Sequence, residues 1–375
     1  MEKNPKMHYR KFGNTGCEIS ALGFGTMRFP KLDDDTADEV EAIKMLRYAI
    51  DRGVNYIDTA YFYHNGESEK IVGKALLDGY RDKVYIATKM PVFKMTCEED
   101  FDKILDEQLT KLQTDHIDFY LLHALNNDSW DKKVLPFNVL EKIKKARAAG
   151  KIRHLGFSFH DDERVFRKIV DGFDEWEFCQ IEYNYIDTDY QAGAEGLQYA
   201  ADKGLGVIVM EPLKGGMLAN PPQAVVDILG NEKSPVEWAL DFLWSLPQVS
   251  FLLSGMSTME QVKANLEFAA NSSIGKYGEK EFNILKKAKQ AIDNLSIVPC
   301  TGCRYCMPCP QEVKIPVIFS AWNTLKNGNN RRDVKNILPD IEEQISKCVK
   351  CGRCVEKCPQ QINIPEALKK ISHKF

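Results

Sequence analysis

Features that would place this chain in a membrane, on a nucleic acid or outside the cell are missing from its sequence. None of the 375 residues belongs to an apolar stretch long enough to span a bilayer, and the N-terminal segment MEKNPKMHYRKFGN lacks the apolar core of a secretion signal. The formal net charge is only −4 and no long basic run occurs, which argues against nucleic acid as a partner. We therefore expect a cytoplasmic protein that binds neither membranes nor nucleic acids.

The glycine-rich fingerprint G-x-G-x-x-G of an open, doubly wound sheet is also missing, since GFGTM at 23–27 does not complete it. Instead, β-rich runs alternate with segments of helical period from about residue 20 to 270. Eight such runs occur: ALGFGTM, VNYID, VYIATKM, IDFYLLH, IRHLGFS, FCQIEYN, GVIVMEP and VSFLLSG. Gly53, Gly150 and Gly204 stand where helix C-caps would fall. The pattern predicts an α/β fold, a (β/α)8 TIM barrel of parallel strands with helices outside.

Cysteine is scarce in this region and crowded after it. Of eleven cysteines, Cys17, Cys97 and Cys179 are scattered, and Cys179 in EFCQIEY is expected to be a buried strand residue. The other eight lie in CTGCRYCMPCP (300–310) and CVKCGRCVEKCP (348–359). CPQEVKIP (309–316) resembles CPQQINIP (358–365), and helical patterns follow both, which indicates a duplicated, mainly helical module. In a reducing cytosol such thiols are metal ligands more often than disulfides.

Zinc and iron–sulfur clusters both use paired C-x-x-C motifs, but the spacing favours clusters. The second run reads C-x2-C-x2-C-x3-C-P, the pattern of two-cluster ferredoxins, in which the fourth cysteine of each run binds the other cluster. The predicted ligands of one 4Fe-4S cluster are Cys300, Cys303, Cys306 and Cys358, and those of the other are Cys348, Cys351, Cys354 and Cys309. The first run is one residue short before its last cysteine, which puts the geometry at Cys309 in question.

Four chemically active residues fall at or just after the carboxyl ends of predicted strands, the face on which barrel enzymes build their sites. They are Asp58, Tyr63, Lys89 and His123. A phenol is too weak an acid at neutral pH unless a neighbouring ammonium stabilises the phenolate, and a carboxylate can hold that ammonium in place. We therefore predict Tyr63 as a proton donor to a carbonyl oxygen, supported by Lys89 and Asp58. His123 would position that oxygen, and a reduced nicotinamide would have to supply the hydride.

The motifs DTAYFYHNGESE, ATKM, DFYLLHAL, GFSFH, QIEYN and MEPLKGG, in this order, resemble the aldo-keto reductase family over roughly residues 7 to 270. The cysteine tail resembles the branch with a C-terminal ferredoxin-type module. The resemblance implies NAD(P)H as cofactor and the same four catalytic residues. It also implies nicotinamide contacts from Ser158 and Gln180, pyrophosphate contacts from the stretch 213–216, and adenosine contacts around 254–265. The complete set of predicted cofactor contacts is Gly25, Thr26, Met27, Ser158, Gln180, Met210, Pro212, Leu213, Lys214, Gly216, Ser254, Gly255, Met256, Gln261 and Asn265.

Some positions depart from the family pattern. Met210 stands where an aromatic ring often stacks on the nicotinamide, and Phe159 follows Ser158 in place of an amide residue. Gly255 and Gln261 stand where many members have basic residues for the 2′-phosphate, so we expect NADH to bind within about tenfold of NADPH. His160 also lies near a strand end and is a further candidate for the site, the alternative being a cap of the following helix.

Three segments are predicted: an aldo-keto reductase-like barrel over 1–275, a connecting helix over 276–296 and a 4Fe-4S ferredoxin-type module over 297–375. The rim aromatics Phe62, Phe93 and Trp130 suggest a small, partly apolar carbonyl substrate.

The role of the clusters is a separate question, because hydride carries two electrons, a 4Fe-4S cluster exchanges one, and no flavin signature is present to connect them. The clusters are therefore structural or sensing, or a redox partner protein supplies their electrons. A ferredoxin-linked electron-transfer protein and a redox sensor remain alternatives. The sequence leaves the oligomeric state open.

Overall fold

The computed structural model describes residues 6–295, 297–326, 338 and 340–372. Its contacts divide the chain into two compact units, one made of Met1–Pro212 and Leu240–Lys276, the other of Leu213–Ala239 and Tyr277–Phe375. The division falls inside helix α9 (Pro235–Ser245). Among the described helices, none combines the length and apolarity that crossing a membrane requires.

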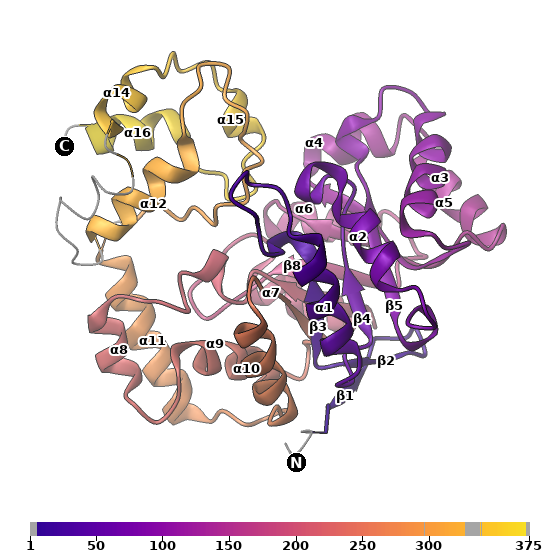
Figure 1. Cartoon of the computed structure of the whole chain (residues 1–375), viewed down its shortest axis with the longest axis horizontal. Coiled ribbons are helices and arrows are strands. Elements are labelled where there is room, and N and C mark those ends of the chain that lie inside the picture. The colour runs from indigo at the N-terminus through magenta and orange to yellow at the C-terminus, as the bar shows by residue number, and fades with distance from the viewer. Residues whose placement is uncertain (1–5, 296, 327–337, 339, 373–375) are drawn as a thin grey trace. The chain divides into compact units, whose positions relative to one another are not determined.

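The first unit contains a closed barrel in which every predicted β-rich run forms a strand (Figure 1). In chain order the strands are β3 (Leu22–Gly25), β4 (Tyr56–Asp58), β5 (Tyr85–Met90), β6 (Ile117–Leu125), β7 (Ile152–Phe159), β8 (Phe178–Glu182), β9 (Gly206–Met210) and β10 (Phe251–Gly255). Each strand pairs in parallel with the next, and β10 closes the barrel onto β3. The predicted parallel barrel is confirmed, and all its strands end at one face.

Helices lie on the outside of the barrel (Figure 1). They are α1 (Glu39–Ile50), α2 (Ser68–Ala75), α3 (Asp100–Leu112), α4 (Asn127–Ser129), α5 (Val139–Ala148), α6 (Glu163–Asp171), α7 (Gly193–Asp202) and α10 (Met259–Ala270). Side-chain caps explain where several begin: Asp38, Asp162 and Thr258 each accept a hydrogen bond from a backbone N–H in the first turn. Because Asp162 caps α6, His160 does not.

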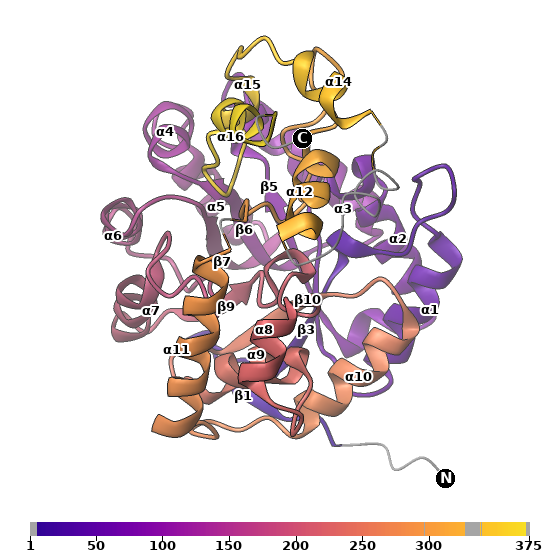
Figure 2. The same cartoon turned by 90° about the vertical axis from the view of Figure 1, so that its left-hand side faces the viewer.

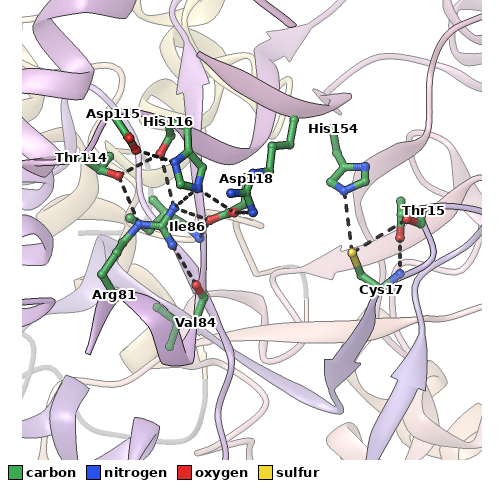
Figure 3. Close-up of polar contacts among 11 residues, drawn as sticks. Thr15, Cys17, Arg81, Val84, Ile86, Thr114, Asp115, His116, Asp118 and His154 are labelled. Carbon is green, nitrogen blue, oxygen red and sulfur yellow. Dashed lines mark hydrogen bonds and ion pairs between the residues drawn. The ribbon is translucent and has the colours of Figure 1, made fainter. Parts of the chain in front are cut away.

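A short hairpin, β1 (Tyr9–Lys11) and β2 (Glu18–Ser20), lies at the amino-terminal end of the barrel. The ring of Phe12 is fully buried and lies 5.0 to 5.2 Å from the rings of Phe119, Phe178 and Phe251. At the same end the buried carboxylate of Asp118 accepts hydrogen bonds from Arg81 and from the backbone N–H of Ile86 (Figure 3). This end is therefore filled, which leaves the carboxyl face for chemistry.

The second unit is helical where the structure describes it. Its helices are α8 (Gln223–Leu229), α11 (Glu279–Asp293), α12 (Ile315–Lys326), α14 (Ile341–Ser346), α15 (Arg353–Glu356) and α16 (Ile364–Ser372). The predicted connecting helix corresponds to α11, which packs along α8 (Figure 2). Between the two cysteine runs, the segment DVKNILPDIEEQISK (333–347) has a helical sequence pattern, and only its second half is described, as α14, because 333–337 and 339 lie outside the described residues. A core that includes Val313, Phe319 and Leu368 joins α12 and α16.

Candidate active site and cluster-binding cysteines

Asp58 and Lys89 form a buried ion pair at the carboxyl ends of β4 and β5. The Lys89 Nζ donates to both carboxylate oxygens of Asp58, at 2.7 and 2.8 Å, and to the carbonyl oxygen of Thr59 at 2.8 Å. Burial lowers the pKa of Lys89 and raises that of Asp58, and the attraction between the two opposes both shifts. Three short contacts hold the ammonium in one position.

Tyr63 and His123 lie close to this pair. The Lys89 Nζ is 5.2 Å from the centroid of the Tyr63 ring, and the His123 ring meets the Tyr63 ring edge-on at 6.3 Å. Tyr63 precedes a left-handed turn at His64 and Asn65, and the His64 Nε2 contacts the carbonyl oxygen of Thr26 at 3.1 Å, which fixes the loop. All four predicted catalytic residues are thus brought together within the first unit.

The imidazole of His123 lies in an apolar setting. The Phe62 ring stacks on it at 5.6 Å, and the Phe93 ring lies 5.9 Å away. Burial, together with Lys89 and His160, holds the pKa of His123 well below its usual range, so this group is a neutral imidazole at pH 7. His160 contacts Gln191 through Nδ1 at 3.2 Å, and burial lowers the pKa of His160 to about 4.

Strand β6 is irregular where it carries His123. Its register with β7 shifts between Leu122 and Leu125, and Ala124 has φ of 54°. The Ala124 N–H donates to Ser158 Oγ at 2.8 Å. Such irregularities change the direction of a side chain at the end of a strand, and here that side chain is the imidazole of His123.

A second layer of buried polar groups, which was not predicted from the sequence, lies behind Lys89. The carboxylate of Glu69 accepts from Thr88 at 2.6 Å and from the side-chain amide of Gln108 at 2.8 Å, and that amide also donates to the carbonyl oxygen of Lys89. Gln108 occupies the inward stripe of α3 with Ile104 and Leu105. A polar residue on an otherwise apolar helix face was the feature of the sequence that could have indicated this buried network.

The predicted nicotinamide contacts lie on adjacent strands. Ser158 and Gln180 are register partners in β7 and β8 and are almost fully buried. The Gln180 side-chain N–H donates to the sulfur of Met210 at 3.4 Å, whereas its Oε1 is buried without a hydrogen-bond partner in the described structure. A buried acceptor of this kind is costly unless a ligand satisfies it. A carboxamide N–H would do so.

At the predicted adenosine end, the structure adds a basic residue, Arg28, that was not predicted from the sequence. The Asn265 side chain donates to Ser254 Oγ at 3.0 Å, which joins α10 to β10. Gly255 is covered by Arg28, since a Cβ there would lie 2.5 Å from Arg28 Cγ. The Ser257 Oγ donates to the carbonyl oxygen of Arg28 at 2.8 Å, and Gln261 accepts from the Ser257 N–H. The structure therefore places the side chain of Arg28 against Gly255, and the expectation that NADH binds within about tenfold of NADPH stays a prediction.

Two further predicted features have surroundings of their own. Trp130 is buried against Gly172 at the end of α6, where a Cβ would lie 2.6 Å from the indole, so it is a packing residue rather than a rim aromatic. The predicted pyrophosphate stretch belongs to the second unit, where Lys214, Gly215 and Gly216 have φ of 45°, 65° and 96°.

The tail thiols influence one another in two groups of four. Burial, together with the thiols of Cys303, Cys300 and Cys358, raises the pKa of Cys306 to about 12. Burial likewise raises the pKa of Cys354, and the neighbouring thiols that add to it are those of Cys348, Cys351 and Cys309. Each group therefore contains the last cysteine of the opposite run. In the described part of the chain no three potential ligands converge on a single ion. A cubane cluster does not require this, because each of its four cysteines bonds a different iron.

The backbone repeats the duplication that the sequence shows. Gly302 and Lys350, which precede the second cysteine of each run, have φ of 66° and 55°, and Arg304 and Gly352, which follow it, have φ of 66° and 79°. After the last cysteines, a backbone N–H donates to the carbonyl oxygen of Cys309 in the first run and of Cys358 in the second. The first run adopts the same turns although it is one residue shorter.

Comparison with known proteins agrees with this geometry. The model of the aldo/keto reductase family matches residues 21–289, and the model of a 4Fe-4S dicluster domain matches 299–362. L-galactose dehydrogenase of Arabidopsis thaliana is 29% identical over 70% of this chain and 88% of its own length. Aldo-keto reductase AKR11C1 from Bacillus halodurans has a TM-score of 0.63 at 24% identity, covering 75% of this chain and 96% of that chain.

A solved aldo-keto reductase from Klebsiella pneumoniae, in complex with NADPH, has a TM-score of 0.61 at 24% identity, covering 75% of this chain and 94% of that chain. These two structures share the barrel fold with this protein. Because the first family model spans most of the sequence, the chain is an oxidoreductase that belongs to the aldo/keto reductase family and carries a 4Fe-4S dicluster domain in its tail.

Proposed function

We propose that this protein reduces the carbonyl group of a small, partly apolar aldehyde or ketone to an alcohol, with a reduced nicotinamide dinucleotide as the hydride donor. The observation that carries the proposal is the buried Lys89 ammonium, which is clamped by Asp58 and lies 5.2 Å from the ring of Tyr63. A positive charge fixed beside a phenol favours its ionisation, so the phenol can release a proton near neutral pH.

Each residue has a distinct role in this proposal. Tyr63 donates its hydroxyl proton to the substrate oxygen, and Lys89 stabilises the phenolate that remains. The neutral imidazole of His123 donates a hydrogen bond to that oxygen and orients it without supplying a charge. Phe62 and Phe93, which flank the imidazole, exclude water and favour a carbonyl compound with an apolar substituent.

The residues that would hold the cofactor fit its chemistry. The unsatisfied Oε1 of Gln180 and the hydroxyl of Ser158 can accept from and donate to the nicotinamide carboxamide. Arg28, whose side chain lies against Gly255, would pair with a 2′-phosphate. The NADPH complex of the Klebsiella relative is consistent with this assignment. When bound, the dinucleotide supplies the hydride.

In the tail, the two groups of thiols would bind two 4Fe-4S clusters in crossed fashion, Cys358 with the first run and Cys309 with the second. The proposed hydride step uses no cysteine. The alternative, a protein whose barrel serves only electron transfer or redox sensing, gives no reason to bury a clamped Lys89 beside Tyr63, because neither role requires an acid.

Replacing Tyr63 with phenylalanine tests the proposal. The Tyr63→Phe variant should lose about a hundredfold or more in turnover of aldehydes and ketones, while dinucleotide binding measured by fluorescence stays nearly unchanged. Tyr61→Phe is the matched control, because the Tyr61 hydroxyl donates to Glu107 instead. Near wild-type turnover by Tyr63→Phe, or an equal loss in both variants, would refute Tyr63 as the proton donor.

A further inference from the structure

Outside the catalytic group, a thiol, an imidazole and a carboxylate meet at the amino-terminal end of the barrel, within the first unit. The Cys17 Sγ lies 3.7 Å from the Nε2 of His154 (Figure 3), and the Nδ1 of His154 lies 2.7 Å from a carboxylate oxygen of Glu177. Cys17 directly precedes β2, His154 lies near the start of β7, and Glu177 directly precedes β8. The proposed carbonyl reduction uses none of them.

The carboxylate of Glu177 decides which nitrogen of His154 carries the proton. Burial would raise the pKa of Glu177, but hydrogen bonds from His154 and from the Leu155 N–H at 3.0 Å, with the nearby charge of Arg147, bring this pKa below its usual value. Glu177 is therefore an ionised acceptor at pH 7, so the Nδ1 of His154 donates to it and the Nε2 of the neutral ring faces the thiol as an acceptor. The Phe119 ring stacks on the imidazole at 4.7 Å and holds its plane.

The turn that carries Cys17 fixes its thiol beside that acceptor. The Cys17 N–H donates to Thr15 Oγ1 at 3.2 Å, and this hydroxyl donates to the carbonyl oxygen of Phe12 at 2.6 Å. The Cys17 S–H has two acceptors, the Thr15 carbonyl oxygen at 3.8 Å and the His154 Nε2 at 3.7 Å, and only the imidazole can take up the proton. The imidazolium that then forms is paired with both a thiolate and the carboxylate of Glu177, the arrangement that activates reactive cysteines.

The other two thiols outside the cysteine runs have different neighbours. Cys179 is fully buried in β8, and burial raises its pKa, so it is an inert core residue. Cys97 is exposed, but it lies beside the carboxylates of Glu99 and Asp100, whose negative charges disfavour a thiolate. Cys17 is half-buried. Accessibility alone would therefore make Cys97 the most reactive of the three, whereas activation by an imidazole would make it Cys17.

We propose that Cys17 is a modification site at which hydrogen peroxide oxidises the thiol to a sulfenic acid, with His154 as the base that activates it. The thiolate sulfur attacks one peroxide oxygen, so that an S–O bond forms and the O–O bond breaks. The sulfur loses two electrons, and the hydroxide that leaves takes the proton held on the His154 Nε2 and departs as water. Cys17 packs against the ring cluster that contains Phe12 and Phe119, which favours an oxidant as small as hydrogen peroxide.

The test compares Cys17 with Cys97 in the same full-length, anaerobically purified holoprotein. Timed exposures to hydrogen peroxide at pH 7, with a chelator present to hold any released iron, are stopped with catalase. The protein is then unfolded in dimedone and iodoacetamide, and mass spectrometry of the two peptides gives the sulfenic acid and the remaining thiol. A free thiol is only about 3% thiolate at pH 7, so activation should make Cys17 react roughly tenfold faster than Cys97 or more. Equal rates, or faster oxidation of Cys97, would overturn the proposal.

Two histidine variants test the role of the base. His154→Gln should slow the oxidation of Cys17 about tenfold and leave that of Cys97 unchanged. His116→Gln is the matched control, because His116 lies at the same end of the barrel but contacts the guanidinium of Arg81 (Figure 3). No slowing in His154→Gln, or equal slowing in both variants, would show that His154 does not activate Cys17. If His154→Gln fails to fold, the comparison of Cys17 with Cys97 in the wild-type chain still decides.

Discussion

Lys89 keeps its charge in a buried site because two oxygens of Asp58 and one of Thr59 accept its hydrogen bonds. These residues could be predicted, since polar side chains at the ends of apolar strands stand out in the sequence. Arg28 could not. Arg28 can approach the predicted cofactor region because Gly255 has no side chain there. The two residues lie at opposite ends of the barrel sequence, so this contact is visible only in the folded structure.

Arg28 carries a prediction about cofactor choice. If its guanidinium pairs with a 2′-phosphate, Arg28→Ala should weaken NADPH binding by about tenfold or more, the worth of a charged hydrogen bond, and hardly change NADH binding. Lys263→Ala serves as the control, because the Lys263 ammonium lies 5.9 Å from the Tyr48 ring on α1. Titration of each variant with both dinucleotides gives the ratio. An unchanged ratio in Arg28→Ala, or a changed one in Lys263→Ala, contradicts the assignment.

His160 makes stability depend on pH. Burial lowers its pKa to about 4, whereas an unfolded histidine has a pKa of about 6.5. Below pH 6.5 the unfolded chain therefore binds more protons, so the folded state loses stability as the pH falls from about 6.5 toward 4. We expect the unfolding temperature to fall between pH 7 and 5, and His160→Gln to show a shallower fall. Parallel curves for variant and wild type would exclude His160 as a source.

At the scale of elements, the amino-terminal floor of the barrel depends on one side chain. Phe12 lies among the rings of Phe119, Phe178 and Phe251, and Gly206 has no side chain where the Phe12 ring passes. Phe12→Ala should lower the free energy of unfolding by about 3–5 kcal/mol, as for other large-to-small core changes. Tyr9→Ala on the same hairpin, where Tyr9 is 47% exposed, should cost much less in the same denaturant titration. Equal losses would show that the floor is not built on Phe12.

The elements were predictable to different degrees. The barrel strands were evident because each is a buried β-rich run bounded by helical patterns. The hairpin β1–β2 was not predicted. Its strands have three residues each, which is too short for an alternation of apolar and polar residues to be recognised in the sequence. The network of Glu69, Thr88 and Gln108 was missed for a related reason: its hydrogen bonds join a helix, a strand and a second helix.

At the scale of the whole molecule, crossed ligation should make the tail one cooperative unit. The sequence pattern predicted the crossing, and the grouping of Cys358 with the first run and of Cys309 with the second supports it. The first run is one residue short between Cys306 and Cys309, and the sequence alone did not show that the turns before this segment, at Arg304 and Gly352, stay equivalent in the two runs. The segment boundaries at 275 and 296 stay predictions.

Cys358→Ala should therefore damage the cluster of the first run, which is distant in sequence, and loosen the tail, because cluster binding and folding are coupled. Iron analysis should give about eight irons per wild-type chain, from two four-iron clusters, and a clear loss in the variant. Carbonyl reduction need not vanish, since no cysteine takes part in the hydride step. Zinc in place of iron, four irons per wild-type chain, or loss of the second-run cluster alone would contradict crossed ligation.

If the barrel transfers hydride directly, the clusters do not carry the reaction's electrons. Deuterium followed through a single turnover under anaerobic conditions, with reduced nicotinamide deuterated at C4 and a carbonyl substrate, distinguishes the two routes. The deuterium should appear on the former carbonyl carbon, with one nicotinamide oxidised per alcohol formed. Deuterium lost to water, or carbonyl reduction driven by dithionite-reduced clusters without any nicotinamide, would contradict it.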